Sequence, residues 1–410
     1  MTISRRDFIS SSLAAAGVGI IVPPVFAKSV FAATADGIHN DRVLVVLQLG
    51  GGNDGLNTVI PYADPAYMSA RPSIAISPEK VLHLNNSVGL NPVMPGMKSL
   101  FDKGQVAVVQ GVGYDQPTYS HFEGLHVWEY ADPKRRQTDG WLGQVLASQL
   151  DTGGHPLTGC ALGSASTPTE LRASGATVSV IESADTYNVQ GGAGRQVAAP
   201  ALYQKTPGAY GVLFDQALST AQSGIKALAD TSKYKPSVPY DPKATVYGSK
   251  NDLASALQLT AQMIVTQPDV KICHVVLGGW DTHQQQDTRQ AALLGYVDSA
   301  VSAFMEDMAA HGMADRVVLF TWSEFGRRVS ENGGKGTDHG AAAPMFVVGK
   351  PVKGGLYGEQ PSLTNTIDSG NLKYSTDFRS VYQSLIRDWL QGDATRVLGG
   401  SFPDLKLMGV

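Results

Sequence analysis

Four segments of the sequence place acids and histidines where metal ligands often occur. In chain order these candidates are Asp54, Asp281 with His283, Glu324, and Asp338 with His339. Carboxylate oxygens and imidazole nitrogens together suit transition metals such as zinc, manganese and iron. We therefore expect a divalent metal, with Zn, Mn, Mg and Ca as candidates. Each group taken alone also fits a plainer role, such as a turn aspartate, a helix cap or a salt bridge.

The segment 114–128 supplies hydroxyl groups at the expected start of a helix. Ser120 or Thr118 would cap that helix, because both residue types are good N-caps. The positive end of the helix and a nearby cation would also lower the cost of forming an alkoxide. We expect Ser120 as the nucleophile, with Thr118 as the second choice. His121 and His126, in the same segment, are either ligands or ordinary partly buried histidines.

Two arginines follow Glu324 in the stretch "SEFGRR". A guanidinium binds an anionic group through two parallel hydrogen bonds. We expect Arg327, or Arg328 beside it, to hold an anionic substrate, although adjacent arginines on a loop are more often solvated or salt-bridged.

Short runs of valine, isoleucine and leucine predict the strands that must position these residues. The runs cover residues 43–49, 106–110, 272–277, 317–321 and 345–348, and helical patterns cover 251–267 and 295–312. Strands that alternate with helices predict an α/β fold with a large, mostly parallel sheet between helices. Ligands in such sheets bind beyond the carboxyl ends of the strands. We therefore expect the acids and histidines to meet at one rim.

The stretch "GGGNDGLN" after the first strand also fits a dinucleotide-binding spacing, with Gly50, Gly52 and Gly55 as the three glycines. Such a loop needs a helix directly after it to hold the pyrophosphate. Prolines 61, 65 and 72 make a long helix there unfavourable. The glycines more plausibly permit a tight turn beside a charged ligand, which leaves Asp54 as a metal candidate.

The N-terminus predicts export. Arg5 and Arg6 precede a short apolar run that Pro23 and Pro24 interrupt, and an A-x-A cleavage site ends at Ala35. This pattern resembles a twin-arginine signal peptide over residues 1–35, and the twin-arginine translocase would carry the folded chain to the periplasm or outside the cell. Residues 36–410 are expected to form a single domain, with a less regular insertion at about 155–250.

The composition limits the possible partners. A formal net charge of −4 argues against general binding of nucleic acid. No other apolar stretch is long enough to span a membrane. The two cysteines, Cys160 and Cys273, do not make a disulfide framework or a cysteine metal site, although one bridge between them is possible.

In combination, the leader and the motifs "LGGGNDGLNTVIPY", "SHF", "GGWDTH", "SEFGR" and "TDHG" resemble the DUF1501 family over nearly the whole chain. That family is similar to the alkaline phosphatase and sulfatase superfamily, whose members hydrolyse phosphate or sulfate esters or move phosphoryl groups. The resemblance implies an alkaline-phosphatase-like fold with one or two metals at the strand ends.

The resemblance also implies roles for single residues. Asp54 matches the acid after the first strand, Ser120 or Thr118 the nucleophile, and His339 the last histidine ligand. Asp281 with His283 matches the acid and histidine in the middle of the chain, at a shorter spacing than usual. Glu324 stands where many members have an Asp-His pair.

These observations predict an exported, metal-dependent hydrolase of phosphate or sulfate esters that acts on a small molecule or a glycan. Two alternatives stay open. One is an exported carbohydrate- or envelope-binding protein that keeps the fold without the chemistry. The other is a periplasmic oxidoreductase loaded with a cofactor, which twin-arginine export also suits.

Overall fold

The computed structural model of the protein describes residues 41–148, 157–183, 234–240, 252–368 and 370–409, with residues 222, 225, 226, 245, 246, 249 and 250. The leader at 1–35 lies outside the described residues, as does most of the expected insertion at 155–250. Among the described helices, none combines the length and apolar character that crossing a membrane requires.

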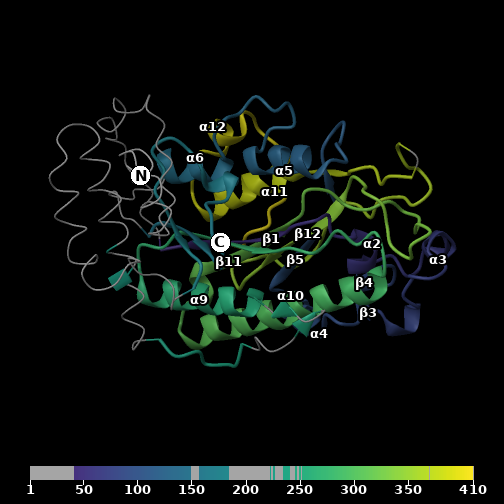
Figure 1. The fold of residues 1–410 in the computed structure, drawn as a ribbon, viewed down its shortest axis with the longest axis horizontal. Coiled ribbons are helices and arrows are strands. Elements are labelled where there is room, and N and C mark those ends of the chain that lie inside the picture. Colours follow the sequence, from purple (N-terminus) through teal and green to yellow (C-terminus); the bar gives the residue numbers. More distant parts are fainter. Residues whose placement is uncertain are drawn as a thin grey trace, which may run out of the picture.

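A nine-stranded sheet forms the centre of the fold (Figure 1). The strand order is β13 (Gly355–Tyr357), β5 (Val106–Gly113), β12 (Ala343–Val348), β11 (Val317–Trp322), β1 (Val43–Leu49), β10 (Ile272–Leu277), β6 (Gly159–Leu162) and β7 (Val178–Ile181), and β14 (Thr376–Asp377) also pairs with β5. β1 lies at the centre, in parallel register with β10 and β11. The predicted α/β fold with a large, mostly parallel sheet is confirmed.

Strand β12 is the exception, because it runs antiparallel to both of its neighbours, β11 and β5. A strand that runs the opposite way begins at the edge where the parallel strands end. The loop before β12 therefore reaches the same rim as the loops after β1, β10 and β11. This direction brings residues 338 and 339 to the rim, although they precede their strand rather than follow it.

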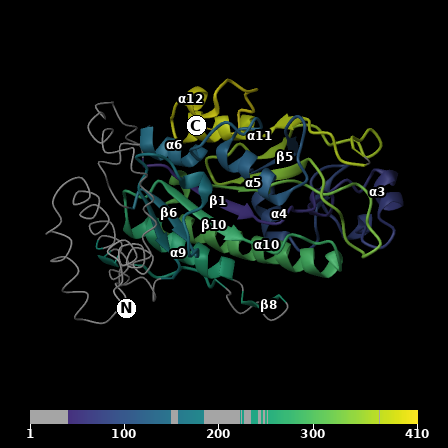
Figure 2. The ribbon, with the colours of Figure 1, turned by 45° about the horizontal axis from the view of Figure 1, so that its top comes forward.

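Helices cover both faces of the sheet (Figures 1 and 2). One layer holds α4 (Pro95–Asp102), α9 (Asp252–Thr266) and α10 (Gln286–Ala310), and the other holds α5 (His121–Tyr130), α6 (Trp141–Ser148), α11 (Phe378–Gln383) and α12 (Ala394–Leu398). Alternate residues of β1 enter the two cores: Val43 and Val45 face α9 and α10, whereas Leu44 and Val46 face the other layer. Burial on both faces explains why β1 is apolar throughout.

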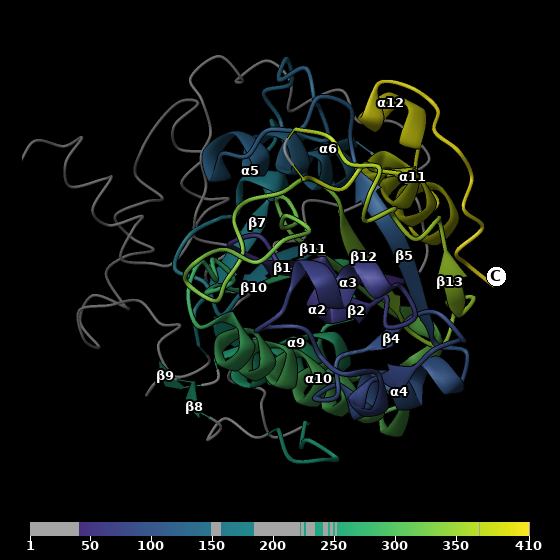
Figure 3. The same ribbon diagram turned by 90° about the vertical axis from the view of Figure 1, so that its right-hand side faces the viewer.

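A smaller group of elements follows β1 at the carboxyl end of the sheet (Figure 3). It contains α2 (Gly55–Thr58), α3 (Pro65–Ala70) and a three-stranded sheet of β2 (Val59–Ile60), β4 (Gly89–Leu90) and β3 (Leu82–His83). A separate two-stranded pair joins β8 (Thr245–Val246) and β9 (Ser249–Lys250). Helix α2 has only four residues, so the glycine loop does not open a helix long enough for the dinucleotide interpretation.

Helix α10 begins at Gln286, nine residues before the predicted start at 295. The first turns carry the polar residues Gln286 and Gln290, which the apolar pattern did not count as buried. Both are buried, because their side-chain amides donate hydrogen bonds to Asp54, from Gln286 to the carboxylate and from Gln290 to the carbonyl oxygen. Polar contacts, rather than apolar ones, hold this end of the helix.

The two cysteines lie side by side. Cys160 on β6 and Cys273 on β10 are direct partners in parallel register, and both are buried free thiols in the same core. Burial raises the pKa of Cys160 to about 12. Both thiols are therefore packed in the core and unreactive in this structure.

Candidate metal centre

Loops from distant parts of the chain meet at the carboxyl rim of the sheet. The loop after β1 lies between the loops after β10 and β11, because β1 pairs with both strands. The loop before β12 joins them through an antiparallel bridge between Arg327 and His339. The segment just before α5 completes the group, since the backbone carbonyl of Tyr119 contacts the ring of His339.

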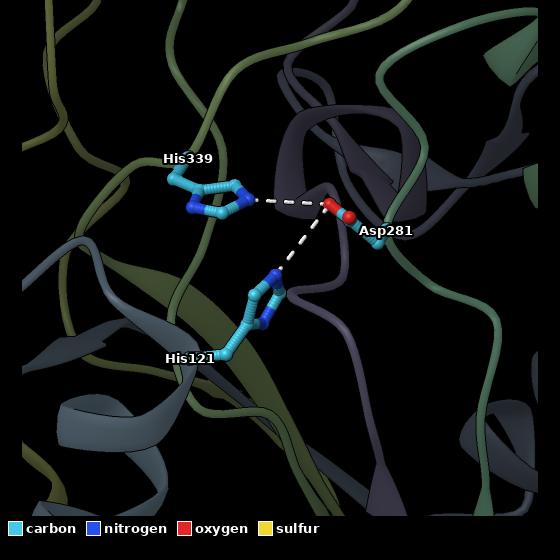
Figure 4. Close-up of side chains that lie close together, drawn as sticks. All are labelled: His121, Asp281 and His339. Carbon is cyan, nitrogen blue, oxygen red and sulfur yellow. Dashed lines mark hydrogen bonds and ion pairs between the residues drawn. The ribbon is translucent and has the colours of Figure 1, made fainter.

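The side chains of His121, Asp281 and His339 point toward one another at this rim (Figure 4). Their ligand atoms all lie within 4.8 Å of each other. Oδ1 of Asp281 lies 3.2 Å from Nε2 of His339 and 3.7 Å from Nε2 of His121. His283 adds a third imidazole, with its Nε2 at 3.1 Å from the same oxygen. One carboxylate oxygen is thus surrounded by three imidazole nitrogens.

An oxygen atom contacts the other nitrogen of each ring. Nδ1 of His121 lies 2.8 Å from Oε1 of Glu324, Nδ1 of His339 lies 2.7 Å from the carbonyl oxygen of Tyr119, and Nδ1 of His283 lies 3.3 Å from Oδ1 of Asp338. A carbonyl oxygen only accepts, so Nδ1 of His339 is the donor. The carboxylates favour the same tautomer in the other two rings. All three Nε2 atoms are then left with lone pairs toward Asp281.

This arrangement of lone pairs needs a positive charge. Nε2 of His283 and Nε2 of His339 lie 3.0 Å apart, and both also face the Asp281 carboxylate. Neutral rings in this tautomer would place two acceptors face to face, which is unfavourable without a proton or a cation. Burial lowers the pKa of His339, and the charge of Arg327 lowers it further, so protonation of that ring is disfavoured.

The donor set fits a divalent metal. Ligands on one tetrahedral zinc lie roughly 3.3 Å apart, because each bond is about 2.0–2.1 Å long. The contacts around Asp281 Oδ1, at 3.1, 3.2 and 3.7 Å, are close to that separation. Metal-bound histidines also commonly donate their second N–H to a carboxylate or a carbonyl, as these rings do. His121, Asp281 and His339 form the group that could hold the metal, and His283 lies next to this group, with its Nε2 3.1 Å from Asp281 Oδ1.

Phe325 supports the two central histidines from one side. Its ring centroid lies 4.8 Å from that of His121 and 4.5 Å from that of His339. The same ring explains Gly52, because a Cβ there would lie 2.2 Å from the Phe325 ring. Gly51 is equally constrained: it has a φ of +126°, and a Cβ would lie 2.6 Å from the backbone nitrogen of Asp281. The glycines of the opening loop therefore permit close packing around the histidines.

Arg327 is a buried structural cation, which differs from the predicted substrate contact. Its Nε and Nη1 donate to the carbonyl oxygens of Gly52 and Thr337, at 2.7 and 2.9 Å. Its Nη2 donates to Asp281 Oδ1 at 2.7 Å and also contacts two backbone carbonyls. With 1% of its surface exposed, Arg327 ties three loops together and has no donor directed to solvent.

Arg327 also fixes the charge of Asp281. Burial raises the pKa of the Asp281 carboxyl group, but the hydrogen bond and charge of Arg327, together with His339 and His283, outweigh burial and lower this pKa to about 2. The carboxylate is therefore ionised at neutral pH, which a metal ligand must be.

Glu324 and Asp338, predicted as possible ligands, instead lie behind the histidines. Glu324 accepts hydrogen bonds from His121 and from the backbone nitrogen of Gly51, at 2.8 and 2.9 Å. Asp338 accepts from the side-chain amide of Asn332 at 3.1 Å, and its contact to Nδ1 of His283 is longer. Both acids orient an imidazole.

Asp54 lies in a different network. Its carboxylate forms a buried, two-pronged ion pair with Arg71 at 2.5 and 2.9 Å, and Gln286 donates a further hydrogen bond to it. Asp54 also caps α2 through the backbone nitrogen of Leu56. Arg71 in turn donates to the carbonyls of Arg328 and Val329. The carboxylate is fully occupied, and Asp54 is absent from the described His–Asp cluster.

We expect Asp54→Asn to lower the free energy of unfolding by about 3–5 kcal/mol, because it leaves the buried Arg71 charge unpaired. Urea unfolding at an unchanged m-value would measure the effect. The control is Asp64→Asn, which replaces the capping aspartate of α3 with an equally good cap. A change of less than about 1 kcal/mol at Asp54 would show that the ion pair is not needed for stability.

The predicted hydroxyls differ in their contacts. Oγ1 of Thr118 donates to Glu123 at 2.7 Å and accepts from the backbone nitrogen of Ser120 at 3.3 Å. Ser120 is the N-cap residue of α5, but its side chain makes no capping hydrogen bond. Within the described part of the chain, the Ser120 hydroxyl has no hydrogen-bond partner. The residues on both sides of it, Tyr119 and His121, each contact the cluster.

His121 was left open between ligand and ordinary histidine, and the structure places it in the cluster. His126 lies elsewhere, with its ring stacked on Tyr130 at 4.3 Å. The carbonyl of Tyr119 and the ring of Phe325 carry no sequence signal for these contacts, because a backbone acceptor and an apolar side chain suit many environments. The spacing of Ser120 and His121 at a helix start is the one signal that pointed to this segment.

Three solved structures that resemble this chain do so at low sequence identity. A protein of the alkaline phosphatase superfamily from Vibrio parahaemolyticus is 10% identical, with a TM-score of 0.36 over 88% of this chain and 72% of that chain. The lipoteichoic acid synthase LtaP from Listeria monocytogenes is 9% identical, with a TM-score of 0.34 over 98% and 80%. An alkaline phosphatase from the Antarctic bacterium TAB5 is 9% identical, with a TM-score of 0.34 over 77% and 94%.

No curated protein matches the sequence. Because the structural scores are low, we base the proposed function on the side chains of this chain. A family described as "Protein of unknown function (DUF1501)" matches residues 41–378, and the chain belongs to that family.

Proposed function

We propose that this protein is an exported, metal-dependent hydrolase of phosphate or sulfate esters. The observation that carries the proposal is the convergence of three imidazole Nε2 atoms on Oδ1 of Asp281, with an oxygen atom on each Nδ1. This set has the ligand types of a metal site, and catalysis there would need a coordination position beyond the four side chains. It also lies at the carboxyl ends of parallel strands, where α/β sheets bind ligands.

The proposed ligands are His121, Asp281, His283 and His339. Glu324, Asp338 and the Tyr119 carbonyl hold the rings in place, as such outer partners do in known metal sites. A divalent metal held there would supply Lewis-acid stabilisation of anionic oxygens and would ease deprotonation of a hydroxyl. Among the candidate metals, zinc agrees best with a set of three imidazoles and one carboxylate.

Ser120 is the proposed nucleophile. Its hydroxyl is uncommitted, and its neighbours in the chain contact the cluster on both sides. The hydroxyl also lies at the positive end of α5, which favours a developing negative charge on its oxygen. Thr118 is less suited, because its hydroxyl already donates to Glu123.

The proposed substrate is an ester of a small molecule or a glycan outside the cytoplasm. The location rests on the predicted twin-arginine leader at residues 1–35, whose arginine pair is Arg5 and Arg6. Folded export would let the chain acquire its metal before it crosses the membrane.

Metal analysis of the purified protein, combined with assays on aryl phosphate and aryl sulfate esters, tests the proposal. We expect about one divalent metal per chain and hydrolysis that a chelator abolishes and the metal restores. A double variant with Arg5→Lys and Arg6→Lys should stay in the cytoplasm, and this retention would support export of the wild-type protein. A metal-loaded protein that cleaves neither ester class would contradict the enzyme proposal.

An exported binding protein is the second candidate, and one contact favours it. Arg327 donates to the same Asp281 oxygen on which the histidines converge, and a fixed cation there competes with a metal. Metal-free protein that binds glycans and hydrolyses nothing would support the binder. Tightly bound NAD or flavin after purification would support the oxidoreductase.

A further inference from the structure

The two adjacent arginines of "SEFGRR" have opposite surroundings. Every guanidinium nitrogen of Arg327 donates a hydrogen bond. Arg328 is half-buried, and its Nε is buried without a partner. Over the residues that the structure describes, its guanidinium has no hydrogen bond or ion pair. Burying a charged donor without an acceptor is unfavourable, so an acceptor from elsewhere is expected to pair with Arg328.

The backbone places Arg328 beside the cluster. Arg327 and His339 oppose each other across an antiparallel bridge, and the next pair along is Arg328 and Asp338, whose backbones are joined by a 3.1 Å hydrogen bond. Successive side chains of an extended segment point to opposite faces. Arg328 therefore shares a face with Asp338. Its charge is near enough to interact electrostatically with Asp338 and with the phenol of Tyr119.

An imidazole ring lies between the centre of the cluster and Asp338, the acid that pairs with Arg328 through the backbone. The ring of His283 separates the two acids, with Asp338 at Nδ1 and Asp281 at Nε2. The ring of His339 likewise separates the Tyr119 carbonyl from Asp281. Among the described residues, no hydrogen bond or ion pair joins the Arg328 guanidinium to Asp281, whereas Arg327 already donates to that carboxylate. The guanidinium is placed for a different part of the same ligand.

The charges around the cluster agree with an anionic ligand. Three carboxylates, those of Asp281, Glu324 and Asp338, and two guanidiniums, those of Arg327 and Arg328, lie in or beside the cluster. A divalent metal would leave this group with one net positive charge. Without Arg328 the group would be neutral, so Arg328 determines whether the rim attracts an anion.

We propose that Arg328 binds a second anionic group of the substrate, one that is not the ester being cleaved. This inference rests on the proposed function and narrows its substrate class to esters with at least two negative groups, such as a multiply sulfated or phosphorylated glycan. A guanidinium suits a planar pair of anionic oxygens, and its unused donors would form a charged hydrogen bond to them. Arg328 is then a specificity-determining residue.

Two substrates test the proposal: naphthyl phosphate, and naphthyl phosphate with a ring sulfonate. In metal-loaded Arg328→Gln we expect the KM of the sulfonated ester to rise about tenfold, with its kcat little changed and the plain ester unaffected. Arg328→Lys should restore part of the affinity, because it keeps the charge without the planar donors. Arg136→Gln removes an exposed charge beyond the end of α5 and serves as the control.

A binding experiment separates this inference from the proposed function. Calorimetry would compare naphthalene disulfonate with naphthalene monosulfonate, neither of which needs turnover. One outcome is that the protein hydrolyses no ester, but Arg328→Gln weakens the binding of the disulfonate and not that of the monosulfonate. The anion subsite would then stand and the hydrolase proposal would fail. The other outcome is that the wild-type protein hydrolyses esters, but Arg328→Gln changes the affinity for both probes equally or changes neither affinity. The subsite would then be overturned and the hydrolase proposal would stand.

Discussion

Asp281→Asn is expected to remove the bound divalent metal and to reduce ester hydrolysis to background. Asp281 Oδ1 is the atom that all three Nε2 nitrogens face. Asparagine keeps the shape but loses the negative charge that offsets a divalent cation, and it also weakens the contact to Arg327. Loss of an orienting partner alone typically costs about 10–100-fold in metal affinity, and loss of a ligand should cost more.

Chelator competition would measure the metal affinity, and elemental analysis would measure the metal content. Asp338→Asn is an informative comparison, because Asp338 only orients His283: we expect about a 10–100-fold loss of affinity there, with metal still bound at saturation. Asp315→Asn is the negative control, since Asp315 is an exposed surface acid paired with Lys350 just before β11. Metal binding by Asp281→Asn at wild-type affinity would eliminate the proposed ligand set.

Ser120→Ala is expected to lower kcat by roughly a thousandfold or more while metal content and stability stay unchanged. The hydroxyl is the proposed nucleophile, so its removal takes away the group that attacks. Stability should not change, because the Ser120 side chain makes no capping hydrogen bond to α5. The variant can therefore test catalysis without affecting folding, because the Ser120 side chain does not cap α5.

Thr118→Val is the matched control for Ser120→Ala. It removes the bonds to Glu123 and to the Ser120 backbone, so we expect it to cost about 1 kcal/mol of stability and to retain most of the activity. The measurements are single-turnover rates on aryl esters and thermal unfolding of both variants. An unchanged rate in Ser120→Ala would exclude Ser120 as the nucleophile, and loss of folding would restore the cap interpretation.

The sequence predicts the elements that position the site better than it predicts the contacts within it. The valine-rich strands follow from apolar runs that are buried on both faces, whereas their order in the sheet does not. The direction of β12 does not follow, because its apolar pattern is the same whichever way it runs. Helix α10 was placed too late, since buried glutamines at its start resemble surface residues.

In the site as well, the sequence predicts some of the residues but not the contacts that they make. Asp281, His283 and His339 were found because acids and histidines next to strand ends are rare and chemically specific. Asp54 met the same criteria, but its partner Arg71 lies in a proline-rich segment and its partner Gln286 lies 232 positions away. Local sequence does not reveal such a partner, so the structure is needed to distinguish an available carboxylate from an occupied one.

The wide sequence separation of the four proposed ligands has a thermodynamic consequence. His121, Asp281, His283 and His339 meet only after β1, β10, β11 and β12 have paired, so the unfolded chain holds no preformed site. A cation that binds the native state alone stabilises it by mass action, by about 2.7 kcal/mol at a hundred times the dissociation constant. Metal binding and folding are then thermodynamically linked, so a change in metal affinity also changes the free energy of unfolding. The melting temperature should rise with metal concentration even in a variant that has no catalytic activity.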